Sequence, residues 1–207
     1  MPDNSDQIVD EAALLALYGA PGTPSLAKET DHLTPAYQAL VEASTFLALA
    51  TSGPGGLDVS PRGDAHGLVF VQDARTLLLP DRRGNNRLDS LRNILCDDRV
   101  ALLMLVPGVG ETLRVNGRAR ILVEPSLLAR FAVDGKAPRT VLRISVERAY
   151  FQCSRAVLRG GLWDRARQRE RDSLPSAGSM IAQASAAPFD ARAYDAALPG
   201  RLADTLY

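Results

Sequence analysis

Three segments in the second half of the chain have the pattern of neighbouring β-strands. Residues 100–106 form a continuous apolar run, and residues 112–123 and 140–151 are longer segments with one apolar face. A Pro-Gly-Val-Gly sequence at 107–110 predicts a tight turn between the first two segments. Strands joined by tight turns pair antiparallel. This part of the chain therefore predicts an antiparallel sheet, with Gly117 inside the second segment marking a bulge.

The segments upstream extend the same pattern. Shorter strands are predicted at 45–50, 57–60, 67–71 and 76–79. Many short strands with few helices between them are typical of an antiparallel barrel with peripheral helices. We expect a barrel domain over 45–165, preceded by a helical segment at 1–44 that packs on it or on a partner subunit. Residues 166–207 are predicted to be an extension, either loose or wrapped around a partner.

Helices are predicted at four places: 5–18 with Ser5 as the N-cap, 34–44 with Thr34 as the N-cap, 86–96, and 126–133. Residues 20–33 are rich in Pro, Gly and Thr and are predicted to be a connector. In the third helix, helical spacing places Leu88, Leu91, Ile94 and Leu95 on the inner face.

Charge and composition exclude several classes of protein. The 24 basic residues balance the 24 acidic ones, so no net charge favours nucleic acid or an anionic membrane. The start of the chain lacks a signal-peptide pattern, and no apolar run approaches the length of a membrane span. We therefore expect a cytoplasmic protein. Cys96 and Cys153 lie far apart without a metal-binding spacing, so neither a zinc site nor a disulfide is predicted.

The densest cluster of polar residues is the run PDRRGNNRLDS at 80–90, which joins a predicted strand to a predicted helix. Arginine forks and the free amides of a helix N-terminus both bind phosphate. The run is equally compatible with a solvated loop in which Asn86 caps the helix and Asp81 and Asp89 pair with nearby arginines. A second motif, SPRGD at 60–64, combines Ser, Arg and Gly at the end of a strand; on composition alone, an ordinary strand end is the better interpretation.

Other notable residues are expected to have structural roles or to lie on the surface. Arg114, Asn116, Arg118 and Arg120 share one strand face, and we expect at least Arg118 and Arg120 to be solvated. Trp163, the only tryptophan, is expected in a core or an interface. The two histidines, His32 and His66, match no catalytic or metal motif and are expected to be structural or solvated. A chain so poor in acid–base groups suggests reactivity supplied by a cofactor.

Three stretches together carry a family resemblance: residues 50–67 with SPRGD, residues 77–108 with PDRRGNNRLDS, and residues 111–121. They resemble the pyridoxamine 5′-phosphate oxidase-like FMN-binding split-barrel family, and more narrowly a subgroup of FMN-dependent proteins with these motifs. The resemblance implies a mainly β fold with helices, built on a six-stranded antiparallel split barrel. It also implies a homodimer with FMN bound between the subunits.

The resemblance also implies a set of cofactor-binding residues. Ser60 and Arg62 match a strand that contacts the flavin, and Leu79, Pro80 and Asp81 match the strand beside its ring. The phosphate-binding loop and helix start correspond to Arg82, Arg83, Asn86 and Arg87. We expect Arg62 and Arg87 to be enclosed parts of the phosphate site rather than surface charges.

One departure limits the activity that can be expected. True pyridoxamine phosphate oxidases carry an Arg-x-His segment near the C-terminus, and this chain has no histidine after His66. An FMN-dependent oxidoreductase of unknown substrate is therefore the leading hypothesis, without oxidation of vitamin B6. The alternatives are a flavin-binding or sensing protein without turnover and a polyanion-binding module. We expect a small-molecule substrate or electron donor, and neither nucleic acid nor a membrane as partner.

Overall fold

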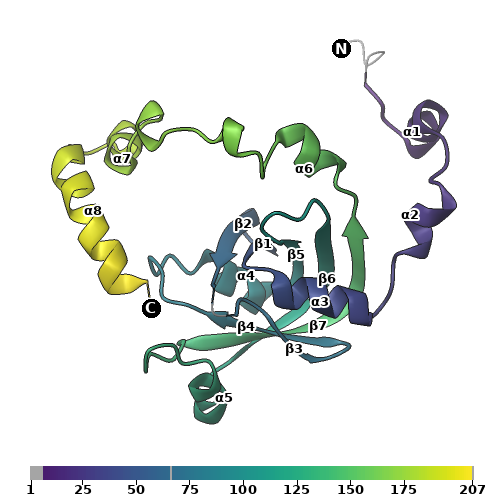
Figure 1. The fold of residues 1–207 in the computed structure, drawn as a ribbon, viewed down its shortest axis with the longest axis horizontal. Helices are drawn as coiled ribbons and strands as arrows, with labels where there is room; N and C mark the ends of the chain where they lie inside the picture. Colours follow the sequence, from purple (N-terminus) through teal and green to yellow (C-terminus); the bar gives the residue numbers. More distant parts are fainter. Residues whose placement is uncertain (1–6, 66, 207) are drawn as a thin grey trace.

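A single antiparallel sheet forms the centre of the molecule (Figure 1). The structure, a computed structural model, describes residues 7–65 and 67–206. Its strands are β1 (Phe46–Gly53), β2 (Gly56–Gly63), β3 (Phe70–Asp73), β4 (Thr76–Asp81), β5 (Arg99–Leu105), β6 (Thr112–Leu122) and β7 (Thr140–Gln152). They are hydrogen-bonded in the order β2-β1-β5-β6-β7-β4-β3. The mainly β, split-barrel class predicted from the sequence is confirmed, but the sheet has seven strands in the described part of the chain, not six.

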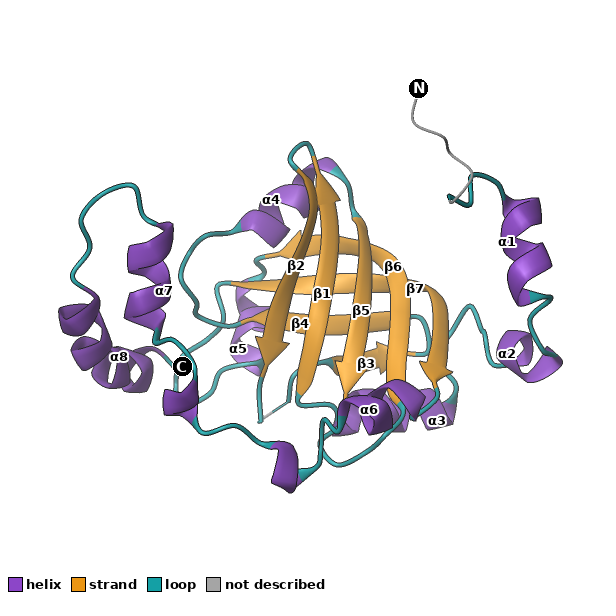
Figure 2. Ribbon diagram, turned by 90° about the horizontal axis from the view of Figure 1, so that it is seen from above, coloured by secondary structure: helices purple, strands orange, loops and turns teal. Residues whose placement is uncertain are grey.

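The two longest strands join the two halves of the sheet (Figure 2). The first half of β6 pairs with β5, whereas the first half of β7 pairs with β4. The β6–β7 register shifts between Asn116 and Gly117: Asn116 pairs with Arg148 and Gly117 with Val146, so Glu147 pairs with neither. The predicted bulge is therefore present, with its extra residue on β7. Gly117 is needed there because a Cβ would lie 2.1 Å from the backbone oxygen of Ser145.

Helices and short turns surround the sheet. They are α1 (Glu11–Tyr18), α2 (Thr23–Ala27), α3 (Pro35–Ala43), α4 (Asp89–Cys96), α5 (Pro125–Arg130), α6 (Arg155–Gly160), α7 (Ala177–Ala184) and α8 (Ala191–Thr205), with 3₁₀ turns at Arg165–Arg167 and Arg171–Ser173. No described helix is both long and apolar enough to cross a membrane.

The core lies between the curved sheet and two helices. Leu47, Leu49, Leu77, Leu79, Leu102, Leu113, Leu142 and Ile144 are almost completely buried. Helix α3 begins as predicted, with the Thr34 hydroxyl accepting from the amide of Tyr37, and it buries Tyr37 and Val41. The sequence places these side chains inward because they are four residues apart on one helical face.

Helix α4 differs from its prediction. It begins at Asp89, and Leu88 precedes it with a left-handed backbone, φ 64°. Leu88 and Leu95 are 45% and 77% exposed, so their predicted inward placement is wrong. Ile94 is buried and Leu91 packs partly buried against the core, as predicted, and Ser90 is buried on the same side. The displaced start moves Leu88 off the helix.

Within the N-terminal segment at 1–44, α3 packs on the sheet, whereas α1 and α2 do not. Helix α1 begins at Glu11 with Asp10 as its N-cap, while the predicted cap Ser5 lies outside the described residues. The short helix α2 interrupts the predicted connector at 20–33. Figures 1 and 2 show α1 and α2 standing away from the sheet, and neither helix has a buried residue.

The C-terminal segment also leaves the body of the molecule. After α6, the indole nitrogen of Trp163 donates to the carbonyl of Val109 at 2.7 Å, which fastens the chain to the β5–β6 turn. Helices α7 and α8 then pack on each other on the opposite side from α1 (Figure 2). The division into domains at 44 and 165 stays a prediction.

Candidate functional site

A cavity of about 830 Å³ opens between β2, the loop and helix start that follow β4, and the segment that leads into β7. Its walls are residues 58–62, 81–91 and 136–140. This volume falls within the range typical of small-molecule sites, about 300–1,000 Å³. Both polar motifs found in the sequence, SPRGD and PDRRGNNRLDS, therefore meet around one cavity.

The cavity wall is strongly basic. Six cationic side chains line it: Arg62, Arg82, Arg83, Arg87, Lys136 and Arg139. Three carboxylates oppose them, those of Asp58, Asp81 and Asp89. The lining therefore carries an excess of three positive charges in a chain whose formal net charge is zero. Such local concentration of one sign attracts an anionic ligand.

Strand pairing assembles the floor of the cavity. Asp81 at the end of β4 pairs with Thr140 at the start of β7, and Arg62 of β2 donates to Asp81 at 3.0 Å. Burial raises the pKa of the Asp81 carboxyl above its ordinary value, and the charge of Arg62 opposes that rise. Two buried polar atoms here, Arg62 Nε and Thr140 Oγ1, have no hydrogen-bond partner among the described residues. Such atoms are costly unless something satisfies them, and here they indicate a place for ligand acceptors.

The loop after β4 is held from behind by Arg82. Its Nε donates to Asp64 at 2.6 Å and its Nη1 donates to the carbonyl of Phe131. Asp64 is almost fully buried, and the Arg82 side chain is 15% exposed. Arg82 therefore braces the loop against the segments after β2 and α5, so its role in this chain is to position the loop.

The same loop has an unusual backbone. Asn86 and Leu88 both have positive φ angles, 58° and 64°, and Leu has no side-chain group to favour that conformation. With Leu88 at the N-cap, no described side chain caps α4. The first residues of α4 line the cavity, so its free amides and positive dipole end lie at the same wall as the arginines.

A small polar network closes the other wall. The Ser60 and Ser90 hydroxyls lie 2.9 Å apart, and Ser90 donates to Asp58 at 3.0 Å. Arg139 donates to the side-chain oxygen of Asn86 at 3.3 Å, which links the segment before β7 to the loop after β4.

Seven of the nine predicted cofactor-binding residues line this cavity: Ser60, Arg62, Asp81, Arg82, Arg83, Asn86 and Arg87. Leu79 and Pro80 are buried behind it and do not line it. The assignment of these residues to a cofactor stays a prediction. The expectation that Arg87 is enclosed is wrong for a single chain, because its side chain is 79% exposed and pairs with Asp89. Arg62, at 24% exposure, fits the expectation better.

The lining residues that were absent from the predicted set include Asp58, Ser90, Lys136, Arg139 and Thr140. Asp58 and Ser90 lie inside or beside the two recognised motifs, and their polar type was an available signal. Lys136 and Arg139 lie about fifty residues further along the chain. Only the β4–β7 pairing brings them to the cavity, and the sequence does not show that pairing.

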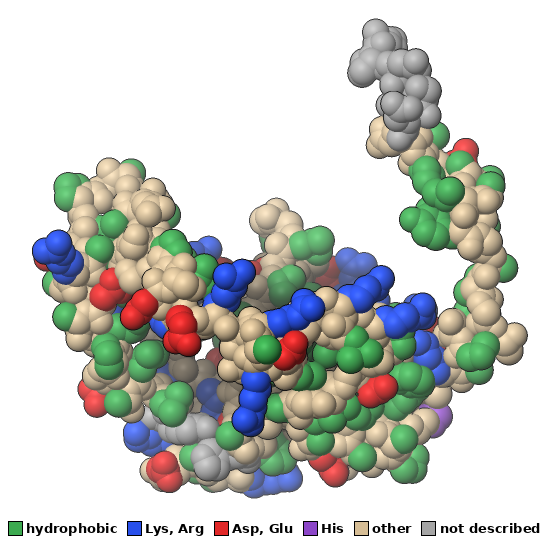
Figure 3. Space-filling model, turned by 45° about the horizontal axis from the view of Figure 1, so that its top comes forward, with side chains coloured by type: hydrophobic (Ala, Val, Ile, Leu, Met, Phe, Trp, Pro, Cys, Tyr) green, Lys and Arg blue, Asp and Glu red, His purple; other side chains and the backbone are tan. Residues whose placement is uncertain are grey.

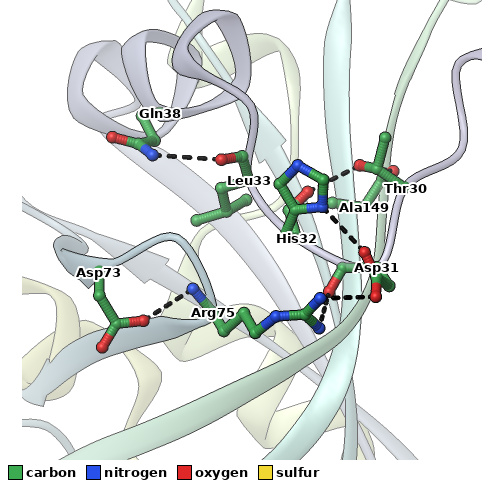
Figure 4. Close-up of polar contacts among 8 residues, drawn as sticks. All are labelled: Thr30, Asp31, His32, Leu33, Gln38, Asp73, Arg75 and Ala149. Atoms are coloured by element: carbon green, nitrogen blue, oxygen red, sulfur yellow. Dashed lines mark hydrogen bonds and ion pairs between the residues drawn. The ribbon is translucent and has the colours of Figure 1, made fainter.

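A second polar cluster, away from the cavity, has a structural role (Figure 4). Arg75 donates to both the backbone oxygen and the carboxylate of Asp31, and His32 contacts the same carboxylate at 2.8 Å. These hydrogen bonds, that of His32 first, lower the pKa of Asp31 to about 2. The cluster ties the segment before α3 to the β3–β4 turn. His66 lies outside the described residues.

The row of polar residues on β6 also matches its structural interpretation. Arg118 and Arg120 are exposed, as predicted. Arg118 pairs with Asp98 at 2.6 Å and Glu147 at 2.7 Å on the sheet surface.

Comparison with known proteins identifies the family. The family model described as pyridoxamine 5′-phosphate oxidase matches residues 33–153, more than half of the chain. The chain therefore belongs to the pyridoxamine 5′-phosphate oxidase family, as its motifs indicated. No curated protein matches it significantly.

Solved structures with similar folds include HupZ of group A Streptococcus, at 17% identity and a TM-score of 0.48, covering 58% of this chain and 94% of that one. A relative of general stress protein 26 from Clostridium acetobutylicum has 16% identity and a TM-score of 0.44, covering 56% and 84%. An FAD-binding protein from Mycobacterium smegmatis has 15% identity and a TM-score of 0.41, covering 59% and 97%.

Proposed function

We propose that this chain is an FMN-dependent oxidoreductase that binds the cofactor in the basic cavity and works as a homodimer. The observation that carries the proposal is the cavity floor, where Arg62 Nε and Thr140 Oγ1 are buried without a hydrogen-bond partner in the described part of the chain. FMN has a phosphate monoester with more than one negative charge and a ring system rich in acceptors. The family resemblance of the motifs leads to the same cofactor.

The residues present fit this group. Arg62, Arg83 and Arg87, with the free amides at the start of α4, would hold the phosphate. Arg82 is engaged with Asp64 and Phe131, so it would keep the loop in place. The bound cofactor would supply hydride or electron transfer. The protein would supply binding, orientation and a partly dry, positively charged setting.

An exposed apolar face supports the homodimer. Four apolar side chains lie on the outer side of the sheet: Phe46 of β1, Leu57 and Val59 of β2, and Leu103 of β5. They share this side because the last three pair with every second residue of β1 counted from Phe46. Their exposed fractions range from 37% for Leu103 to 88% for Leu57. An apolar sheet face of this kind normally marks a protein interface.

The first test is the spectrum of the purified protein. We expect absorbance bands of an oxidised flavin, and release of FMN on denaturation, identified by chromatography. Bleaching of these bands by a nicotinamide donor without oxygen would support an oxidoreductase over a protein that only binds flavin. Release of FAD, or a colourless protein that takes up no flavin, would contradict the proposal.

Oxidation of vitamin B6 compounds is not expected. The segment after β7 forms α6 and the C-terminal arm and has no histidine, so the Arg-x-His substrate segment is missing. The FMN-loaded protein should form no pyridoxal phosphate above background from pyridoxine or pyridoxamine phosphate. Efficient turnover of either compound would show that another segment provides substrate binding.

A further inference from the structure

The N-terminal arm, residues 7–27, is an apolar element that no other described residue of its own chain covers. Every residue in it is exposed. Seven of the eight residues of α1, EAALLALY, are apolar, and Leu17 and Tyr18 are 67% and 76% exposed. A helix of this length is not stable in water without tertiary packing. The arm therefore requires a surface to pack on.

The arm is anchored only at its base. Thr30 and Ala149 of β7 exchange backbone hydrogen bonds of 3.0 and 2.8 Å, and the Tyr37 hydroxyl donates to the carbonyl of Lys28 at 2.5 Å. Beyond this point the chain leads away from the sheet (Figures 1 and 2). The base is fixed on β7, whereas the exposed apolar face lies over β2, β1 and β5.

Charge indicates what the arm would meet. Residues 7–27 contain Asp10 and Glu11 and no basic residue. Residues 155–171, which include α6, contain six arginines against Asp164 and Glu170. Figure 3 shows basic side chains spread over the body of the molecule between the N-terminal arm and the helices α7 and α8. Each chain thus presents an acidic, apolar arm, and separately an apolar sheet face and a basic segment.

We propose that residues 7–27 dock on a second copy of this chain, so that each subunit holds its partner with its N-terminal arm. In a two-fold dimer every contact between the subunits occurs twice. Self-association can therefore cover the arm and the apolar sheet face of both chains. The inference rests on the proposed dimer but is separate from FMN binding.

The test compares two apolar-to-charged substitutions of nearly equal exposure in the full chain. Leu17→Asp changes the arm, where Leu17 is 67% exposed, and Val123→Asp changes the residue directly after β6, where Val123 is 65% exposed. We expect Leu17→Asp to raise the dimer dissociation constant roughly tenfold or more in sedimentation equilibrium. Val123→Asp should leave the constant unchanged. Thermal melting would show that both variants are folded.

A photo-crosslinking amino acid at Leu15 gives a second measurement that does not depend on affinity. We expect a covalent species of twice the 22.2 kDa chain mass. Crosslinks only within one chain, or equal dissociation constants for the wild type and Leu17→Asp, would overturn the arm proposal and leave the dimer standing. A monomeric wild type would overturn both, whatever its flavin content.

Discussion

Arg62→Ala is expected to weaken FMN binding by more than tenfold, with little change for riboflavin, which lacks the phosphate. The substitution removes a cation from the cavity floor and leaves the carboxylate of Asp81, its partner at 3.0 Å, uncompensated beside the bound phosphate. Truncating one member of a buried charged pair typically costs about 2–5 kcal/mol. Each ~1.4 kcal/mol is a tenfold change in affinity. Fluorescence titration of the apoprotein measures both ligands.

The matched control is Arg75→Ala. Arg75 also pairs with an aspartate, Asp31 at 2.6 Å, but that pair is exposed and lies away from the cavity (Figure 4). Exposed pairs of this kind contribute little to stability. FMN affinity should be unchanged in this variant. Equal FMN affinity in Arg62→Ala and the wild type would show that the phosphate lies elsewhere.

Gly117→Ala is expected to lower the stability of the fold by about 3 kcal/mol, at the upper end of the range for overpacking. A Cβ at this position would lie 2.1 Å from the backbone oxygen of Ser145 and 3.0 Å from its carbonyl carbon. Because these are backbone atoms of β7, the added Cβ requires β7 itself to move at the bulge. This bulge lies in the two strands that join the halves of the sheet. For a chain of this size the melting temperature should fall by roughly 6–12 °C.

Gly55→Ala is the control for that measurement. Gly55 lies in the β1–β2 turn, where an added Cβ meets no atom of the described residues within 4 Å and the backbone has no positive φ. Its melting temperature should stay close to that of the wild type. Equal melting temperatures for Gly117→Ala and the wild type would contradict the close packing of β6 against β7.

Local sequence signals predicted where helices and strands lie in the chain better than they predicted which residues these elements pack against. The Thr34-Pro35 start of α3 and the strands around the turn at 107–110 follow from capping and turn chemistry, which act within a few residues. The start of α4 was misjudged because helical spacing takes no account of the left-handed backbone at Leu88.

The site was predictable where it is contiguous in sequence. The run at 80–90 supplies one wall, and its cluster of arginines is visible in the sequence alone. Lys136, Arg139 and Thr140 come from a distant segment and reach the cavity only through the pairing of Asp81 with Thr140. The N-terminal arm could not be placed from sequence either, because the apolar residues of α1 are not buried against any other described part of the chain.

The most direct test of the account is calorimetric titration of the apoprotein with FMN and with riboflavin. The basic cavity predicts one FMN per chain and an affinity for riboflavin that is weaker by roughly tenfold or more, the difference being due to the phosphate. Equal affinities for the two compounds, or no binding of either, would contradict the assignment of this cavity as an FMN site.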